Sequence, residues 1–584
     1  MIASEPLATS WFAPALSSWP LAPDRCLVRN PLNGAVLELS SGEFAIVSAC
    51  EGCQPLAAHE AHAARELSAP PAHRPAFRGL LERCAREGLF VSLPDLVARF
   101  GAPSPALASP LGGIAIRTAD RPQLLARLLE SAAKLEARAA IQRRWLVFDD
   151  SRDPAHALAN RAAIAGCRNL DVAYRGCGEA ATLAAELRAA FPHAKDEIAW
   201  LLEAGGDAEA TYGRPLNQAL LCFAGRAFLS VDDDVVLDAR RPARMQPGFT
   251  VSDDADDLAW YDDAEAMWRD CPPLPLDPLA AHADWLGMPL AAAWARAGAQ
   301  AGPLGEIRFA AEQAERFAPK ARVLFTHNHA CGDPGSSLLP LQLLSLPPSS
   351  RQWLAAHPGA AASAFAQRVN WRGQTRLRLA PRRVFTLTTL AGIDNSQLMP
   401  PAARTHRSED VLLGIVAQLI HPHAWMVDLP FGLPHLRVPS KQWLPPDVSF
   451  LQEPLHVLYA LLDEHAASIV AESPRGRLMA AAVLLQDVAA MNDATLSEVL
   501  LEHASDAGSR TLFAIAEQLD SADTPPQWKA LLAPWLKSPA LAVDADSLRG
   551  RMLAPGTVRS LADTYGRAMA VWPDLWQFCR ERFK

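Results

Sequence analysis

Three consecutive aspartates, Asp232, Asp233 and Asp234, follow a short apolar segment, residues 227–231, whose residue types favour a β-strand. Side chains alternate along a strand, so Asp232 and Asp234 are expected on one side and Asp233 on the other. Two carboxylates on one side supply the hard oxygen ligands that Mg2+ or Mn2+ prefers, and leave coordination positions open for a diphosphate. The alternative is a solvated acidic loop, although three adjacent carboxylates repel one another without a counter-charge.

A second acidic pair, Glu409 and Asp410, begins an apolar segment of helical type, residues 411–420. The helix dipole stabilises negative charge at this position, so the two acids could serve only the helix. Alternatively, one of them could act as the general base of a transfer reaction. His327 and His329 also invite a metal interpretation. Carboxylates suit a hard metal better, however, so we interpret this pair as hydrogen-bonding loop residues.

The elements that must position the aspartates alternate between strand and helix. An apolar run of helical type, residues 216–223, ends before Gly225, and the strand at 227–231 follows it. The same alternation occurs earlier, with strands at 113–117, 145–148 and 171–174 and helices at 123–139 and 155–165. Acids that follow strands in such an alternation predict a parallel α/β sheet, with a nucleotide site at the carboxyl ends of its strands.

The chain after residue 235 gives weaker signals. A stretch from Asp253 to Asp263 carries six aspartates together with Trp260 and Tyr261, and we interpret it as a solvated loop. The remaining expected elements are helices at 291–301 and 309–317, strands at 321–326 and 383–389, and a turn at 332–336.

Two regions flank the α/β part. Residues 26–39 predict a β-hairpin around Asn33-Gly34. A capped helix near Ser40, helices at 56–67 and 76–87 and a strand at 89–91 complete a small winged-helix-like module. The tail has helical periodicity throughout, with breaks near 505–509 and 520–525. We therefore divide the chain into a module at 1–100, a linker at 101–112, an α/β domain at 113–440 and an all-α region at 441–584.

Composition excludes several classes of protein. The 584 residues carry a net charge of −9, which argues against a general nucleic-acid binder. No run of about 18 apolar residues occurs, so no membrane span is expected, and the N-terminus lacks the pattern of a signal peptide. The 10 cysteines include a single C-x-x-C, at Cys50 and Cys53, without a second pair at zinc spacing. Buried thiols in a reducing compartment are the favoured interpretation, and a cytoplasmic location is expected.

Three motifs in order, IAIRTADRPQLLARLLES, WLVFDDSRD and YGRPLNQALLCFAGRAFLSVDDD, resemble the nucleotide-sugar domain of GT-A-fold glycosyltransferases. The similarity is strongest to the large inverting group whose strand ends read T-x-x-R-P, D-D-x-S-x-D and D-x-D. The resemblance implies a metal-dependent transfer of a sugar from a nucleotide-diphosphate donor, with Mn2+ or Mg2+ as the cofactor.

The same resemblance implies roles for matching positions. Asp232 and Asp234 would be the D-x-D pair that holds the metal, with Asp233 beside them at the donor. His435 would be a third metal ligand, with His421 and His423 as competitors. Asp410 would be the general base, and Glu409 would bind the acceptor or sugar. The residues implied at the nucleotide, its ribose and the diphosphate are Arg117, Thr118, Asp120, Asp149, Asp150 and Asn217. A local ion pair between Arg117 and Asp120 is the alternative for those two.

The first region has its own resemblance. The segments NGAVLELSSGEF, ACEG and LLERCAREGLF are similar to PqqD-like domains, which hold the leader segments of ribosomally made peptides. The implied acceptor is then a peptide or protein that the N-terminal module engages. Two alternatives remain. One is a transferase for a cell-envelope glycan or a lipid-linked acceptor, with a structural N-terminal module, and the other is a non-catalytic peptide-binding protein.

Overall fold

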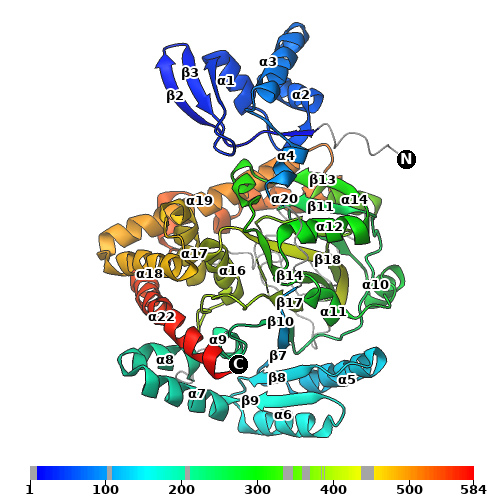
Figure 1. Cartoon of the computed structure of the whole chain (residues 1–584), viewed down its shortest axis with the longest axis vertical. Coiled ribbons are helices and arrows are strands. Elements are labelled where there is room, and N and C mark those ends of the chain that lie inside the picture. Colours follow the sequence, from blue (N-terminus) through cyan, green and yellow to red (C-terminus); the bar gives the residue numbers. More distant parts are fainter. Residues whose placement is uncertain are drawn as a thin grey trace.

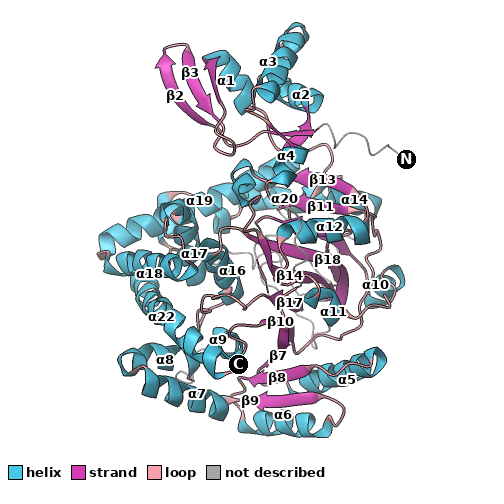
Figure 2. Cartoon of the chain, in the orientation of Figure 1, coloured by secondary structure: helices cyan, strands magenta, loops and turns pink. Residues whose placement is uncertain are grey.

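The computed structural model describes residues 10–101, 108–203, 211–332, 346–357, 369–382, 385–386, 389–435 and 453–583. The protein is mixed α/β and is built on one twelve-stranded sheet with helices around it (Figures 1 and 2). Parts of four expected features lie outside the described residues. These are the turn at 332–336, the strand at 383–389, the linker at 101–112 and the boundary at 440–441.

One half of the large sheet is parallel, as the alternation predicts. Its strands are β7 (Leu111–Thr118), β8 (Arg144–Asp149), β9 (Asp171–Arg175) and β10 (Ala227–Asp232), in the spatial order β10-β7-β8-β9. The helices of this half are α5 (Pro122–Ala139), α6 (Pro154–Gly166), α7 (Cys177–Ala190), α8 (Lys195–Leu202) and α9 (Gly213–Cys222), with a short 3-10 helix at Pro192–Ala194. Alternation along β7 sends Ile114 and Ile116 into one apolar core and Ala115 into the other, so both faces of the sheet are buried.

The strand order contains a reversal that creates a ligand crevice. The chain moves outward from β7 to β8 and β9, and then returns to place β10 on the other side of β7. In open α/β sheets, ligands bind outside the carboxyl ends of the strands at such a reversal. The carboxyl ends here are Arg117-Thr118 on β7 and Asp232 on β10, and Arg117 and Asp232 are register partners.

The prediction of a wholly parallel sheet is wrong for the second half. The strand β17 (Leu390–Ile393) runs antiparallel between β10 and β14 (Arg322–Gly332), and β14 pairs in parallel with β18 (Ala424–His435). The strands beyond are β16 (Leu377–Ala380), β11 (Phe249–Ser252) and β13 (Leu304–Arg308), with β12 (Asp257–Trp260) and β15 (Asn370–Gly373) off this path. The helices of this half are α10 (Ala264–Asp270), α11 (Pro278–Ala283), α12 (Leu290–Ala301), α14 (Pro348–Ala356) and α16 (Glu409–Ile420), and residues 311–316 form a 3-10 helix, η4 (Ala311–Arg316), where an α-helix was expected.

The acidic stretch after β11 is not a simple solvated loop. Asp256 is buried and bonds to Arg372 and Arg378, at 3.2 Å each. Trp260 and Tyr261 are buried in an apolar cluster, and of the six aspartates only Asp262 and Asp263 are exposed. The interpretation failed because the arginines that neutralise Asp256 lie more than a hundred residues further along the chain.

The N-terminal module, residues 10–100, forms the expected hairpin. Strands β3 (Arg25–Arg29) and β4 (Val36–Ser40) pair across the Asn33-Gly34 turn, and β2 (Ser17–Ala22) adds an unpredicted third strand. A capping box of Ser40 and Glu43 begins α1 (Ser41–Ser48). The remaining elements are α2 (Leu56–Glu66), α3 (Arg74–Arg86), α4 (Leu93–Ala98), a 3-10 helix at Pro71–His73 and a small sheet of β1 (Ser10–Phe12), β5 (Cys53–Pro55) and β6 (Val91–Ser92). The module lies at the top of Figure 1, above β13.

The C-terminal region is helical, as expected. Its α-helices are α17 (Pro454–Glu464), α18 (Pro474–Ala490), α19 (Asp493–Asp520), α20 (Pro526–Leu532), α21 (Ala545–Arg549) and α22 (Pro555–Arg582), and short 3-10 helices lie at Ala466–Ser468, Ala533–Lys537 and Pro539–Leu541. α22 joins this region to the sheet, because Trp572 and Trp576 donate to Met399 O (2.6 Å) and Asn395 Oδ1 (2.9 Å). These bonds fix the segment that leads to Glu409. A search of the described helices finds none with the length and apolar character that a membrane span requires.

Candidate active site

Asp232, Asp234 and His435 converge at the carboxyl end of β10. Their ligand atoms all lie within 4.8 Å of one another, and His435 Nε2 is 2.9 Å from Asp234 Oδ1. His435 reaches this place because it is the last residue of β18, which forms an antiparallel bridge to Val235. β10 ends at Asp232, so a turn, rather than strand alternation, brings Asp234 to the same side. His421 bonds to Leu398 O at 2.8 Å and is not in this group.

Asp233 faces the end of β7. Its carboxylate accepts a hydrogen bond from Thr118 Oγ1 at 2.7 Å and pairs with Arg121 Nη1 at 3.2 Å. Burial raises the pKa of Asp233 to about 6, against the opposing effect of Arg121. Thr118 and Arg121 therefore hold the acidic turn against β7. Apart from the R-P of the first motif, no pattern in the sequence pointed to Arg121.

Arg117 connects the aspartates to the acids that begin α16. Its guanidinium bonds to Asp232 Oδ1 at 2.6 Å and lies 3.7 Å from Glu409 Oε1. Burial, followed by repulsion from Asp410, raises the pKa of Glu409 to about 8, so Glu409 keeps its proton at neutral pH. The two acidic pairs, separated by more than 170 residues in the chain, thus belong to one site.

The site gathers five carboxyl groups around three basic side chains. The carboxyl groups are Asp232, Asp233, Asp234, Glu409 and Asp410, and the basic groups that form ion pairs with them among the described residues are Arg117, Arg121 and His435. Burial also raises the pKa of Asp232, because it disfavours the charged form of the carboxyl group. A divalent cation would offset the excess. Two carboxylates and an imidazole form a donor set that suits Mn2+ better than Mg2+, because Mg2+ strongly prefers oxygen ligands.

The acids expected at the nucleotide are engaged mainly with the protein. Asp149 accepts hydrogen bonds from Ser151 N (2.9 Å), Asn160 Nδ2 (2.9 Å) and Tyr174 OH (2.8 Å), which leaves one acceptor position on its carboxylate. Asp150 pairs with Arg214 and accepts from Thr211, and so ties β8 to the start of α9.

Asp120 and Asn217 have structural contacts. Asp120 has a left-handed backbone, with φ of 55°, and accepts from the backbone N–H groups of Arg152 and Asp153 at 3.1 Å. It therefore does not pair with Arg117, and it shapes the loop after β8. Asn217 is fully buried and exchanges two hydrogen bonds with the backbone of Ala402, at 2.7 and 3.0 Å. The expected contact of Asn217 with the diphosphate or sugar is wrong, because a buried and fully bonded amide cannot reach either.

A second group of potential ligands lies inside the sheet. His327 and His329 belong to β14 and are buried, so their interpretation as loop residues is wrong. Their ring nitrogens and a carboxylate oxygen of Asp428 lie within 4.8 Å of one another. Asp428 is already neutralised, since Arg378 Nε bonds to its Oδ2 at 2.7 Å and both side chains are buried. No local pattern in the sequence pointed to Asp428.

The chain has no recognisable counterpart in three comparisons. No protein-family model matches it, no curated protein is significantly similar to it, and no solved structure resembles it at a significant level.

Proposed function

We propose that the protein is a metal-dependent, inverting glycosyltransferase with a GT-A-like donor domain, which moves a sugar from a nucleotide diphosphate to a peptide or protein acceptor. The observation that carries this proposal is the convergence of Asp232, Asp234 and His435 at the strand reversal, with Arg117 joining Asp232 to Glu409. Such a reversal is where open α/β sheets bind nucleotides. Ligands for a divalent cation beside a pair of acids are what a transfer from a diphosphate requires.

Each acid has a proposed part in the reaction. The nucleophilic group of the acceptor attacks the anomeric carbon from the face opposite the diphosphate, and Asp410 takes the proton that this group loses. The bond from the anomeric carbon to the diphosphate oxygen breaks, and the oxygen keeps the electron pair. Attack from the opposite face inverts the configuration of the sugar. A cation bound by Asp232, Asp234 and His435 would neutralise the charge that develops on the diphosphate.

The division of labour between Glu409 and Asp410 follows from the pKa of Glu409, about 8. A carboxyl group that is protonated at neutral pH cannot accept a further proton, but it can donate a hydrogen bond to a sugar or acceptor oxygen. We therefore assign the base to Asp410, at the N-terminus of α16, and a binding role to Glu409.

The donor is tested by thermal denaturation of the full chain with UDP-, GDP- and dTDP-sugars, each with Mn2+, with Mg2+ and with chelator. At least one nucleotide sugar should raise the melting temperature only when the cation is present. In that assay Asp410→Asn should behave as wild type, yet transfer by this variant should fall about 100- to 10,000-fold. Transfer by Asp410→Asn at the wild-type rate would refute the base assignment, and absence of any cation-dependent donor effect would refute the proposed function.

A further inference from the structure

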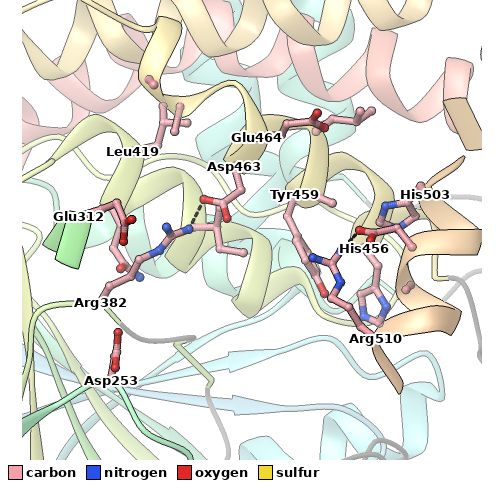
Figure 3. A pocket seen from close by; sticks show the side chains of 18 of the residues that line it. Asp253, Glu312, Arg382, Leu419, His456, Tyr459, Asp463, Glu464, His503 and Arg510 are labelled. Atoms are coloured by element: carbon pink, nitrogen blue, oxygen red, sulfur yellow. Dashed lines mark hydrogen bonds and ion pairs between the residues drawn. The ribbon is translucent and has the colours of Figure 1, made fainter. Parts of the chain in front are cut away.

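A large cleft separates the sheet from the C-terminal helices. It has a volume of about 1320 Å3, and its walls come from η4, α16, α17 and α19 (Figure 3). One end of it is marked by His456, whose Nε2 is 3.0 Å from Ser408 Oγ. Ser408 is the residue directly before Glu409. The bond between His456 and Ser408 ties one end of the cleft to the N-terminal end of α16, although Glu409 and Asp410 are not among the residues that line the cleft.

A second cavity, of about 1000 Å3, lies between the N-terminal module and the large sheet. The module contributes Phe44, Val47 and the segment 50–54, and the sheet contributes Gly305–Arg308 of β13. Among the described strands β13 has one neighbour, β11, so it is an edge of the sheet. An edge strand presents unpaired backbone N–H and C=O groups, which bind an extended peptide by adding it as a further strand.

Asp253 and Glu312 line both cavities. These residues are therefore a wall common to both spaces, which together we call the module–base groove. Its lining extends from α1 of the module and β13, by way of η4, to His456. Figure 3 shows Asp253 and Glu312 at one side of the large cleft and His456 with His503 at the other.

The module–base groove is acidic. Among the described lining residues of the two cavities, nine carboxylates stand against five guanidiniums. Arg382 and Arg510 already pair with Asp463 and Asp506. The carboxylates are Glu51, Asp253, Glu306, Glu312, Glu315, Asp463, Glu464, Glu502 and Asp506. Surplus negative charge of this kind attracts a positively charged ligand and repels an acidic one.

We propose that the module–base groove binds the acceptor as an extended peptide segment of net positive charge, which pairs through its backbone with the edge of β13 and lies against Glu312 and Glu502. This inference rests on the proposed function for the identity of the reaction, but the binding itself requires no donor and no metal. A free edge strand selects a peptide backbone over a glycan, and the acid excess selects its charge.

The test is fluorescence anisotropy of labelled synthetic peptides with the full chain, at low salt and without nucleotide or metal. Three probes of equal length are used, a lysine- and serine-rich peptide, its glutamate counterpart, and the lysine peptide with alternate backbone nitrogens methylated. The lysine peptide should bind at least about tenfold more tightly than the glutamate peptide. N-methylation should weaken its binding to a similar extent, because it removes the donors that a sheet edge needs.

The variant Glu312→Lys/Glu502→Lys should lower the affinity for the lysine peptide about tenfold or more. Glu498→Lys is the matched control, since Glu498 is exposed on α19 one helical turn before Glu502 but does not line the cleft. All three positions are exposed, so the substitutions should leave the fold intact. Glu498→Lys should bind as wild type.

Equal binding of the lysine and glutamate peptides, unchanged binding in the double variant, or undiminished binding of the methylated peptide would each overturn the inference, as would binding of a neutral oligosaccharide in place of any peptide. Because no donor is present, this result is independent of the thermal assay. Charge-selective binding that the double variant loses would support the groove even if no nucleotide sugar stabilised the protein.

Discussion

Two clusters in this protein offer metal ligands, and they differ in charge and access. At the end of β10, Asp232 keeps a side-chain exposure of 25%, and five carboxyl groups lie beside Arg117, Arg121 and His435 in the described part of the chain. Inside the sheet, Asp428 is fully buried beside His327 and His329. Arg378 neutralises the charge of Asp428, and Arg372 neutralises that of Asp256. A divalent cation would relieve repulsion in the first cluster and would add uncompensated charge to the second. We therefore choose between the two clusters by local charge balance as well as by ligand type.

The largest effect is expected from the interior cluster. Asp428→Asn removes the charge that faces a buried guanidinium, so the free energy of unfolding should fall by about 3 kcal/mol. Affinity for Mn2+ should not change. Urea denaturation and calorimetry of the same preparation measure both quantities. Loss of Mn2+ binding with unchanged stability would reverse the roles that we give to the two clusters.

An Asp→Asn substitution in the cluster at the end of β10 should weaken donor binding and leave stability nearly unchanged. Asp234→Asn relieves repulsion with Asp232 and Asp233, so the stability of the metal-free protein should change by less than about 1 kcal/mol. Cation-dependent donor binding should weaken more than about 100-fold, because a direct ligand is lost. Thermal denaturation with and without donor reports both. A large loss of stability without a loss of donor binding would make Asp234 a structural residue.

The imidazole of His435 should set the choice of metal. His435→Asn replaces a nitrogen ligand with an oxygen, so the ratio of Mn2+ to Mg2+ affinity should fall about tenfold. His327→Asn, in the interior cluster, is the control and should leave the ratio unchanged. Competition between the two cations in donor-binding assays gives the ratio. If His327→Asn shifted it and His435→Asn did not, the cation would belong inside the sheet.

The last prediction concerns pH. The pKa of Glu409 is raised from 4.5 to about 8, so the folded state binds a proton that the unfolded state has lost in this window. Its contribution is present below pH 4.5 and is lost as the pH rises through about 8. Glu409→Gln should therefore remove this decline in stability between the two pH values. Denaturation of the metal-free protein at several pH values measures it, and identical profiles would contradict the raised pKa.

Sequence predicted the parts of the fold that depend on neighbouring residues. The strands β7 to β10 and the helices α5, α6 and α9 lie where the alternation places them, because burial of both faces of a parallel sheet imposes that pattern. The helices α7 and α8 were not predicted. The direction of β17 was not predictable, since pairing with strands far along the chain decides it. Similarly, Gly508 was expected near a break, yet α19 runs through it. A side chain there would collide with Val543, so the glycine permits a close contact without ending the helix.

The candidate site was also predicted only in part. The aspartates, His435 and the Glu409–Asp410 pair were predicted from motifs, and the structure brings them together. The contacts of Arg117 with Asp232 and Glu409 were missed, because an ion pair between distant segments leaves no trace in residue spacing. Asn217 was misassigned because a buried amide that bonds to the backbone of Ala402 has the same sequence signature as one that binds a ligand.

We propose that the acids at the end of β10 hold a divalent cation against a nucleotide diphosphate. The decisive experiment is titration calorimetry of the metal-free full chain with Mn2+, in the presence and absence of nucleoside diphosphates. We expect one cation per chain, tighter binding when the matching diphosphate is present, and loss of this binding in Asp234→Asn but not in Asp428→Asn. Absence of cation uptake under all of these conditions would contradict this proposal.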